Sequence, residues 1–64
     1  MSSAVDHEFD GKRVEKFTGE ARWVGLCLVT YKTSKGGVRH LIEVEPQGFQ
    51  MIAVTNQLRL LDEH

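Results

Sequence analysis

The stretch RWVGLCLVTYK, residues 22–32, is the longest β-prone run of this 64-residue chain and decides its fold class. It is rich in β-branched and aromatic residues, which favour strands over helices. Period-two alternation divides it into two faces, with Trp23, Cys27, Val29 and Tyr31 on one and Val24, Leu26 and Leu28 on the other. Because both faces are apolar, we expect this strand to be covered on both sides. Gly25 is expected to mark a bend or a bulge.

Shorter strand candidates lie on both sides of this run, and turn signals separate them. The strands are expected at residues 12–17, 38–45, 49–54 and 58–61, with a 3-10 turn at 55–57. Five short strands with turns between them predict an all-β fold, a small five-stranded SH3-like barrel. We place this barrel at residues 11–61, after a flexible acidic N-terminal arm (1–10) and before a C-terminal tail (62–64).

A chain of this length forms one domain and buries only about 60% of its unfolded surface. Cys27 is the only cysteine, and no zinc-ligand spacing is present. Self-association is the remaining common way to bury more surface, so we expect a homo-oligomer. No apolar run reaches the roughly 18 residues of a membrane span, and the N-terminus does not resemble a signal peptide. We therefore expect a cytoplasmic protein with no membrane partner.

The charged residues are unevenly distributed, although the formal net charge is only −1. Residues 12–39 contain seven basic and two acidic residues, whereas the flanking segments are acidic. Such a basic segment can attract an anionic partner, and nucleic-acid binding through residues 12–39 is one hypothesis. The overall acidic balance disfavours it.

Few residues are candidates for catalysis on their own chemistry. Cys27 lies among leucines, which indicates a buried structural thiol, because a reactive cysteine needs exposure and a basic neighbour. His40 alternates with apolar residues, as a packed histidine does. Glu43 and Glu45 share a strand face about 7 Å apart, yet exposed strand carboxylates are the ordinary interpretation. No metal site is predicted.

A longer series of residues occurs in the same order as in a known family. The series is Gly11, Arg13, Val14, Lys16, Gly19, Ala21, Trp23, Gly25, Tyr31, Thr33, Glu43, Glu45, Gly48, Gln50, Val54 and Leu58. In this order the chain resembles the plasmid-borne, trimethoprim-insensitive type II dihydrofolate reductases. The resemblance implies an SH3-like barrel and, for that family, a homotetramer around one central pore.

The resemblance also implies roles for particular residues. Gln50 corresponds to the pore glutamine that contacts folate and nicotinamide, Lys16 to a lysine that attracts both anionic ligands, and Trp23 to a residue at the subunit contact. At residues 49–52 the chain has FQMI where the family has Val-Gln-Ile-Tyr. A reductase would therefore use Gln50, Met51, Ile52 and Lys16, with NADPH bound near Gln50 and Lys16.

The chain also resembles small barrel proteins of phages and mobile elements. Our first hypothesis is a non-catalytic protein-binding module, an accessory or inhibitor protein of a phage or mobile element that uses no cofactor. Its contact residues would be Trp23, Tyr31 and Phe49, and its partner another protein or a second copy. The alternatives are the NADPH-dependent reductase and the nucleic-acid binder, so enzymatic activity stays an open question at this point.

Overall fold

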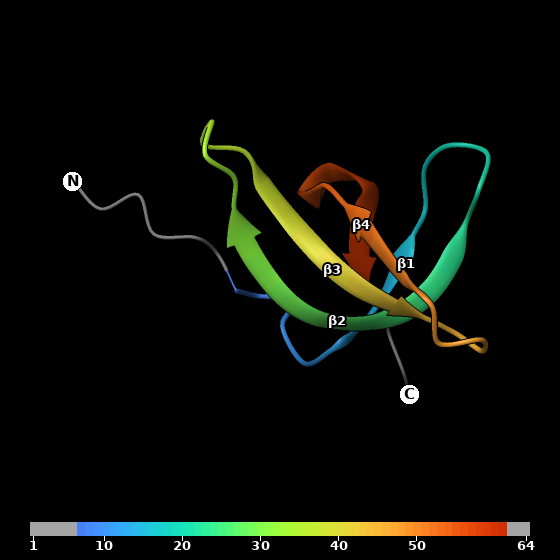
Figure 1. The fold of residues 1–64 in the computed structure, drawn as a ribbon. Helices are drawn as coiled ribbons and strands as arrows, with labels where there is room; N and C mark the ends of the chain where they lie inside the picture. Colours follow the sequence, from blue (N-terminus) through green and yellow to red (C-terminus); the bar gives the residue numbers. More distant parts are fainter. Residues whose placement is uncertain (1–6, 62–64) are drawn as a thin grey trace.

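The structure is a computed structural model that describes residues 7–61 (Figure 1). It contains, in chain order, β1 (Arg13–Lys16), β2 (Trp23–Lys32), β3 (Val38–Val44), β4 (Gln50–Ala53), the 3-10 turn η1 (Thr55–Gln57) and β5 (Leu58–Leu60). The strands form one antiparallel sheet in the order β4-β3-β2-β1-β5. The predicted all-β class, with five strands and a 3-10 turn before the last, is confirmed.

The sheet curves because β2 is long and irregular. Cys27 lies opposite Ile42 and Val29 lies opposite Leu41, so Leu28 is an extra residue in β2. Such a bulge bends a strand and increases its twist, and Figure 1 shows β2 as a long arc beside β3. The expected bulge therefore exists, but at Leu28 rather than at Gly25.

Gly25 has a different role, which is close packing of backbone. It pairs with Val14 of β1 and Val44 of β3. A Cβ atom at this position would lie 2.6 Å from the carbonyl oxygen of Glu43 and 2.6 Å from Cγ2 of Ile42. Only glycine fits this space without moving β3.

The bulge also changes which side chains of β2 point inward. Cys27 and Thr30 are buried, whereas Val29 and Tyr31 are exposed. The prediction that Cys27, Val29 and Tyr31 share one face is wrong, because the extra residue interrupts the alternation of period two. The prediction of cover on both faces is also wrong for the described residues, since the outer side of β2 remains open.

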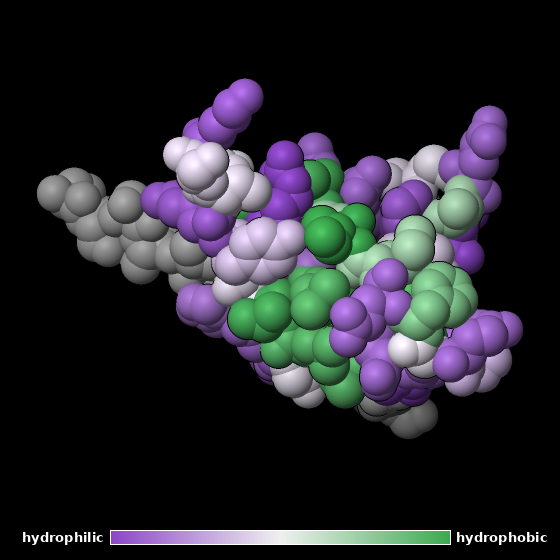
Figure 2. Space-filling model, viewed as in Figure 1, coloured by the Kyte–Doolittle hydropathy of each residue, from purple (hydrophilic) through white to green (hydrophobic). Residues whose placement is uncertain are grey.

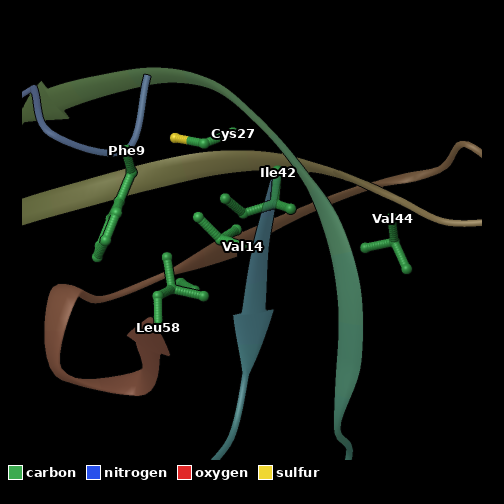
Figure 3. Packing of buried hydrophobic residues seen from close by; sticks show 7 residues of the cluster. Phe9, Val14, Cys27, Ile42, Val44 and Leu58 are labelled. Atoms are coloured by element: carbon green, nitrogen blue, oxygen red, sulfur yellow. The ribbon is translucent and has the colours of Figure 1, made fainter. Parts of the chain in front are cut away.

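The core lies between the inner side of the curved sheet and the segment before β1. Its buried members are Phe9, Val14, Cys27, Ile42, Val44, Ala53 and Leu58 (Figure 3), and Trp23 packs against them. The buried thiol predicted for Cys27 is confirmed.

Part of the segment assigned to the N-terminal arm belongs to the folded domain. Phe9 is only 7% exposed, because its ring fills the core beside His40. Backbone bonds from Gly11 N–H to the Cys27 carbonyl (2.8 Å) and from Cys27 N–H to the Lys12 carbonyl (3.0 Å) attach the segment to β2. The fold thus begins before Gly11, while residues 1–6 of the predicted arm and the tail at 62–64 lie outside the described residues.

The last strand is held by backbone bonds to β1 at both of its ends. The Phe17 N–H donates to the carbonyl of Gln57 at 3.1 Å, and the Leu61 N–H donates to the carbonyl of Arg13 at 3.0 Å. No helix in residues 7–61 has the length and apolar character needed to cross a lipid bilayer.

Candidate functional site

The outer side of β2, β3 and β4 presents a continuous group of apolar side chains. The register places Val29, Leu41 and Ile52 in one row across the three strands. Val29 is 43% exposed and Ile52 is 58% exposed. Figure 2 shows the apolar side chains gathered on this side of the molecule. We call this surface the outer apolar face and define it as Leu26, Leu28, Val29, Tyr31, Leu41 and Ile52.

The described residues expose many large apolar side chains for so small a chain. Single exposed apolar residues are normal on soluble proteins, whereas contiguous apolar patches mark interaction surfaces. In residues 7–61, seven large hydrophobic side chains are exposed, as many as the buried core contains. They are Leu28, Val29, Tyr31, Phe49, Met51, Ile52 and Leu60. All but Leu60 lie on β2, on β4 or directly before β4.

The bulge is the local cause of the face. If β2 alternated regularly, Val29 and Tyr31 would follow Cys27 into the core. The extra residue, Leu28, turns both of them outward, beside Leu26. The inner positions that remain are occupied by Cys27 and the polar Thr30.

The tetrapeptide compared with the reductase family, residues 49–52, is exposed along its length. Phe49 is 50% exposed, and Gln50 lies on the outer side opposite Glu43. Met51 lies opposite the buried Ile42 at the border of the core. Gln50 and Ile52 therefore border or belong to the outer apolar face, and Met51 points to the other side of β4.

Lys16, the other residue of the predicted cofactor site, contacts a turn. Its Nζ donates to the carbonyls of Thr18 at 2.7 Å and Ala21 at 2.9 Å, which closes the connection between β1 and β2. The register across the sheet runs from Gln50 through Glu43 and Leu26 to Arg13. Within one chain, Lys16 and Gln50 are therefore not in the same row.

Arg13, which lies in the row of Gln50, forms a bidentate ion pair. Its guanidinium donates to both carboxylate oxygens of Glu45, at 2.9 and 2.8 Å. Glu45 is thus paired with a cation and not with Glu43. An open concavity of about 330 Å³ adjoins this pair, and another of about 430 Å³ adjoins Arg13 alone of the two residues.

The three residues expected at a protein contact lie in different environments. Tyr31 belongs to the outer apolar face, and Phe49 is exposed next to β4. Trp23 is half-buried against the core, and its indole N–H is buried with no acceptor among the described residues. Such an unpaired donor costs about 1–3 kcal/mol.

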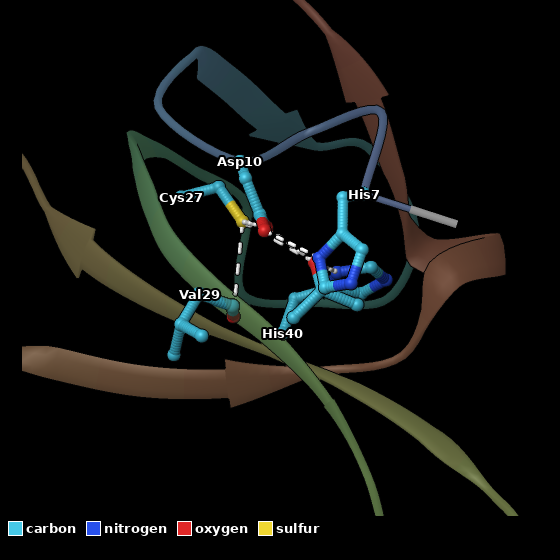
Figure 4. A network of polar contacts seen from close by, with 6 residues as sticks. His7, Asp10, Cys27, Val29 and His40 are labelled. Carbon is cyan, nitrogen blue, oxygen red and sulfur yellow. Dashed lines mark hydrogen bonds and ion pairs between the residues drawn. The ribbon is translucent and has the colours of Figure 1, made fainter. Parts of the chain in front are cut away.

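A polar cluster, which the sequence did not predict, crosses the inner side of the curved sheet (Figure 4). The hydroxyl of Thr30 donates to Oδ1 of Asp10 at 2.6 Å, so its oxygen accepts from Nδ1 of His40 at 2.8 Å. Nε2 of His40 lies 2.7 Å from the hydroxyl of Thr55. His7 adds a contact of 2.6 Å to Oδ2 of Asp10.

These contacts determine the protonation of His40. Because Thr30 gives its only proton to Asp10, Nδ1 of His40 must carry a proton. In the neutral ring, Nε2 then accepts from Thr55. Both ring nitrogens are satisfied, so His40 is a structural residue, as predicted. Its position on an apolar face was the sequence signal for a packed histidine, because a buried imidazole requires polar partners. The sequence did not identify Asp10 and Thr30 as those partners.

The cluster shifts two titrations. The hydrogen bond from Thr30 is the main cause that lowers the pKa of Asp10 below its ordinary 3.8, with His7 acting in the same direction. Burial raises the pKa of the Cys27 thiol above its ordinary 9.0. Cys27 is therefore an inaccessible thiol whose burial favours the protonated form.

The basic residues of segment 12–39 do not gather at one place. Arg22 directly precedes β2, whereas Lys32 is the last residue of the same ten-residue strand. Arg13 is paired with Glu45, and Lys16 closes a turn. In residues 7–61, no group of three or more His, Cys, Asp or Glu side chains is arranged to hold a metal ion.

Comparisons with protein families, with curated proteins and with solved structures find no match to this chain. Its function must therefore be argued from its own surfaces, among which the outer apolar face is the most distinctive.

Proposed function

We propose that this chain is a non-catalytic protein-binding module that acts through its outer apolar face. The observation that carries the proposal is the row formed by Val29, Leu41 and Ile52, which stays open to solvent on three adjacent strands. Burying such side chains contributes about 25 cal/mol per Å² of apolar surface. A partner with a flat, uncharged and apolar surface fits this face best.

The environment of the reactive residues supports a binding role. Both nitrogens of His40 are engaged by threonine hydroxyls, and the Cys27 thiol is buried. Lys16 is bonded to two backbone carbonyls. These side chains stabilise the fold, and they leave the outer apolar face as the feature that the fold does not use for itself.

A module of this kind changes the behaviour of another protein by covering part of its surface. We therefore propose an accessory or inhibitor role, as for small proteins of phages and mobile elements. Aromatic residues at the centre or border of a face commonly supply much of the binding energy. Tyr31, which belongs to the outer apolar face, is suited to that task here.

The test uses two charge substitutions at exposed apolar residues. Ile52→Lys places a cation in the outer apolar face, and Leu60→Lys places one on β5 as the matched control. Each protein is immobilised, retained proteins are identified, and the binding of each is repeated with purified components. The proposal expects a partner that binds the parent and Leu60→Lys equally and Ile52→Lys at least about tenfold more weakly.

Two results would contradict the proposal. Oxidation of NADPH that requires dihydrofolate and is lost in Gln50→Ala would favour the reductase. Salt-sensitive retention on DNA with no effect of Ile52→Lys would favour nucleic-acid binding through residues 12–39.

A further inference from the structure

β4 lies at one edge of the sheet, and its free side presents backbone groups. The Val44 N–H donates to the carbonyl of Phe49 at 2.8 Å, in register with the β3–β4 ladder. Antiparallel pairs alternate between bonded and non-bonded. Gln50 and Ile52 are therefore the β4 residues whose N–H and C=O groups point away from β3. Within residues 7–61, no backbone bond outside the strand ladders involves either residue.

The two edges of the sheet are protected to different degrees. β5 carries Arg59, whose Nε donates to Glu15 at 3.0 Å. Charged side chains on an edge strand discourage the addition of a further strand. Residues 49–54 contain no charge and no proline, and the β3–β4 register has no bulge. β4 is thus the edge that is open to extension.

We infer that a second copy of this chain binds at this edge, with the two β4 strands antiparallel about a twofold axis and Ile52 opposite the partner's Ile52. This inference rests on the proposed binding function of the outer apolar face, because the second copy would join that face at its β4 border through Ile52. In this register, the row of Val29, Leu41 and Ile52 continues through the partner's Ile52 and the partner's Leu41. An apolar row would then cross six strands without a break.

The charges of this region favour a second copy over a charged partner. Gln50 would lie opposite the partner's Val54, so no charged side chain stands on either strand of the new ladder. Glu43 and Arg39 lie on β3, one strand away from the edge, and do not meet their own copies across it. A neutral apolar strand is complementary to itself, and a twofold interface requires that property. The pairing also buries surface that so small a domain cannot bury alone.

The first measurement is the mass of the full chain by sedimentation equilibrium at micromolar concentrations. We expect a dimer for the parent and for Leu60→Lys, and a monomer for Ile52→Lys. Circular dichroism checks that each variant is folded. We expect each variant to fold, because the substituted residues are exposed.

The second measurement tests the register by thiol cross-linking. In Ile52→Cys the two thiols face each other across the axis, whereas in Gln50→Cys they lie about 14 Å apart, four residues along the strand. A bifunctional thiol reagent that spans less than about 14 Å should link only Ile52→Cys. The parent serves as control, because Cys27 is buried.

A parent that remains monomeric, or a dimer that survives Ile52→Lys, would overturn the inference. Equal cross-linking of Ile52→Cys and Gln50→Cys would overturn the register. The proposed function would fail in a different way. It would be refuted if a purified partner bound Ile52→Lys as tightly as the parent. A monomer whose outer apolar face binds another protein would refute the dimer alone.

Discussion

The inner and outer sides of the sheet are completed in opposite ways. On the inner side, even polar residues are buried, and Thr30 and His40 find hydrogen-bond partners there. On the outer side, apolar residues such as Val29 and Ile52 stay in water. The difference shows that one chain completes its own interior but leaves the outer apolar face exposed, which is the face that we propose binds a partner.

The largest expected effect comes from a matched pair of isoleucines on the two sides. Ile42 is fully buried, and Ile52 is exposed on the neighbouring strand. We expect Ile42→Ala to lower the free energy of unfolding by about 2–5 kcal/mol, because it leaves a cavity in the core. Ile52→Ala should change it by about 0.5 kcal/mol or less, since surface substitutions have small effects.

Chemical denaturation at a concentration where the chain is monomeric measures both values. Equal losses for Ile42→Ala and Ile52→Ala would mean that the outer side is as closely packed as the inner side. The contrast between the two sides would then be lost.

The next effect concerns close packing on the inner side at Gly25. Gly25→Ala places a methyl group against the Glu43 carbonyl and the Ile42 side chain. We expect a loss of about 1–3 kcal/mol, because an overpacked site must shift its neighbours. Gly36→Ala is not a suitable control, since Gly36 has a φ of 88°. Gly37→Ala is more suitable, because only a flexible arginine side chain and the Thr33 hydroxyl lie near. A thermal midpoint for Gly25→Ala as high as that of Gly37→Ala would contradict the expectation.

A third effect tests the buried polar cluster. Thr30→Val keeps the shape of the side chain but removes the hydroxyl between Asp10 and His40. We expect a loss of about 1–3 kcal/mol, because the buried His40 and the partly exposed Asp10 are left with unmade bonds. Thr55→Val should cost less, since Thr55 is exposed and water can replace its hydroxyl. Denaturant titration of both variants measures the difference, and the reverse order would show that the cluster is not held through Thr30.

The smallest effect is a pH dependence that comes from Asp10. Its folded pKa is lowered, so its contribution to stability is present above the ordinary value of 3.8 and is lost as pH falls through the lower folded pKa. Asp10→Asn should therefore lower the thermal midpoint near neutral pH, and its difference from the parent should shrink in strong acid. Asp10 forms hydrogen bonds with Thr30 and His7, so the measurement reports on how firmly the segment before β1 is attached to the sheet. A difference that is constant with pH would refute this role of the carboxylate.

The elements of the fold were predictable because they depend on short-range signals. The β-branched and aromatic run at 22–32, the glycine turns and the polar break at 55–57 each predicted the observed element to within one residue or so. The core was predictable for Cys27 and His40, whose neighbours are apolar. Phe9 was missed because it lies in a polar segment, and only the fold brings its ring beside His40.

The candidate site was predictable only in part. Tyr31 and Phe49 were predicted as contact residues; the structure shows both exposed, and their contacts stay a prediction. The outer apolar face was not predicted, because alternation of period two assigned Val29 and Tyr31 to the side of Cys27. Lys16 was predicted to attract anionic ligands, and only the structure shows that it donates hydrogen bonds to two turn carbonyls.

The amino-acid sequence by itself determined the strands of this protein, since side-chain shape and turn residues act over a few positions. The tertiary structure decided which side of each strand is buried. A bulge at Leu28 is a property of the pairing between β2 and β3, and its outcome depends on the register with Ile42 and Leu41. One extra residue in that pairing turns Val29 and Tyr31 outward, and so produces the outer apolar face that the proposed function requires.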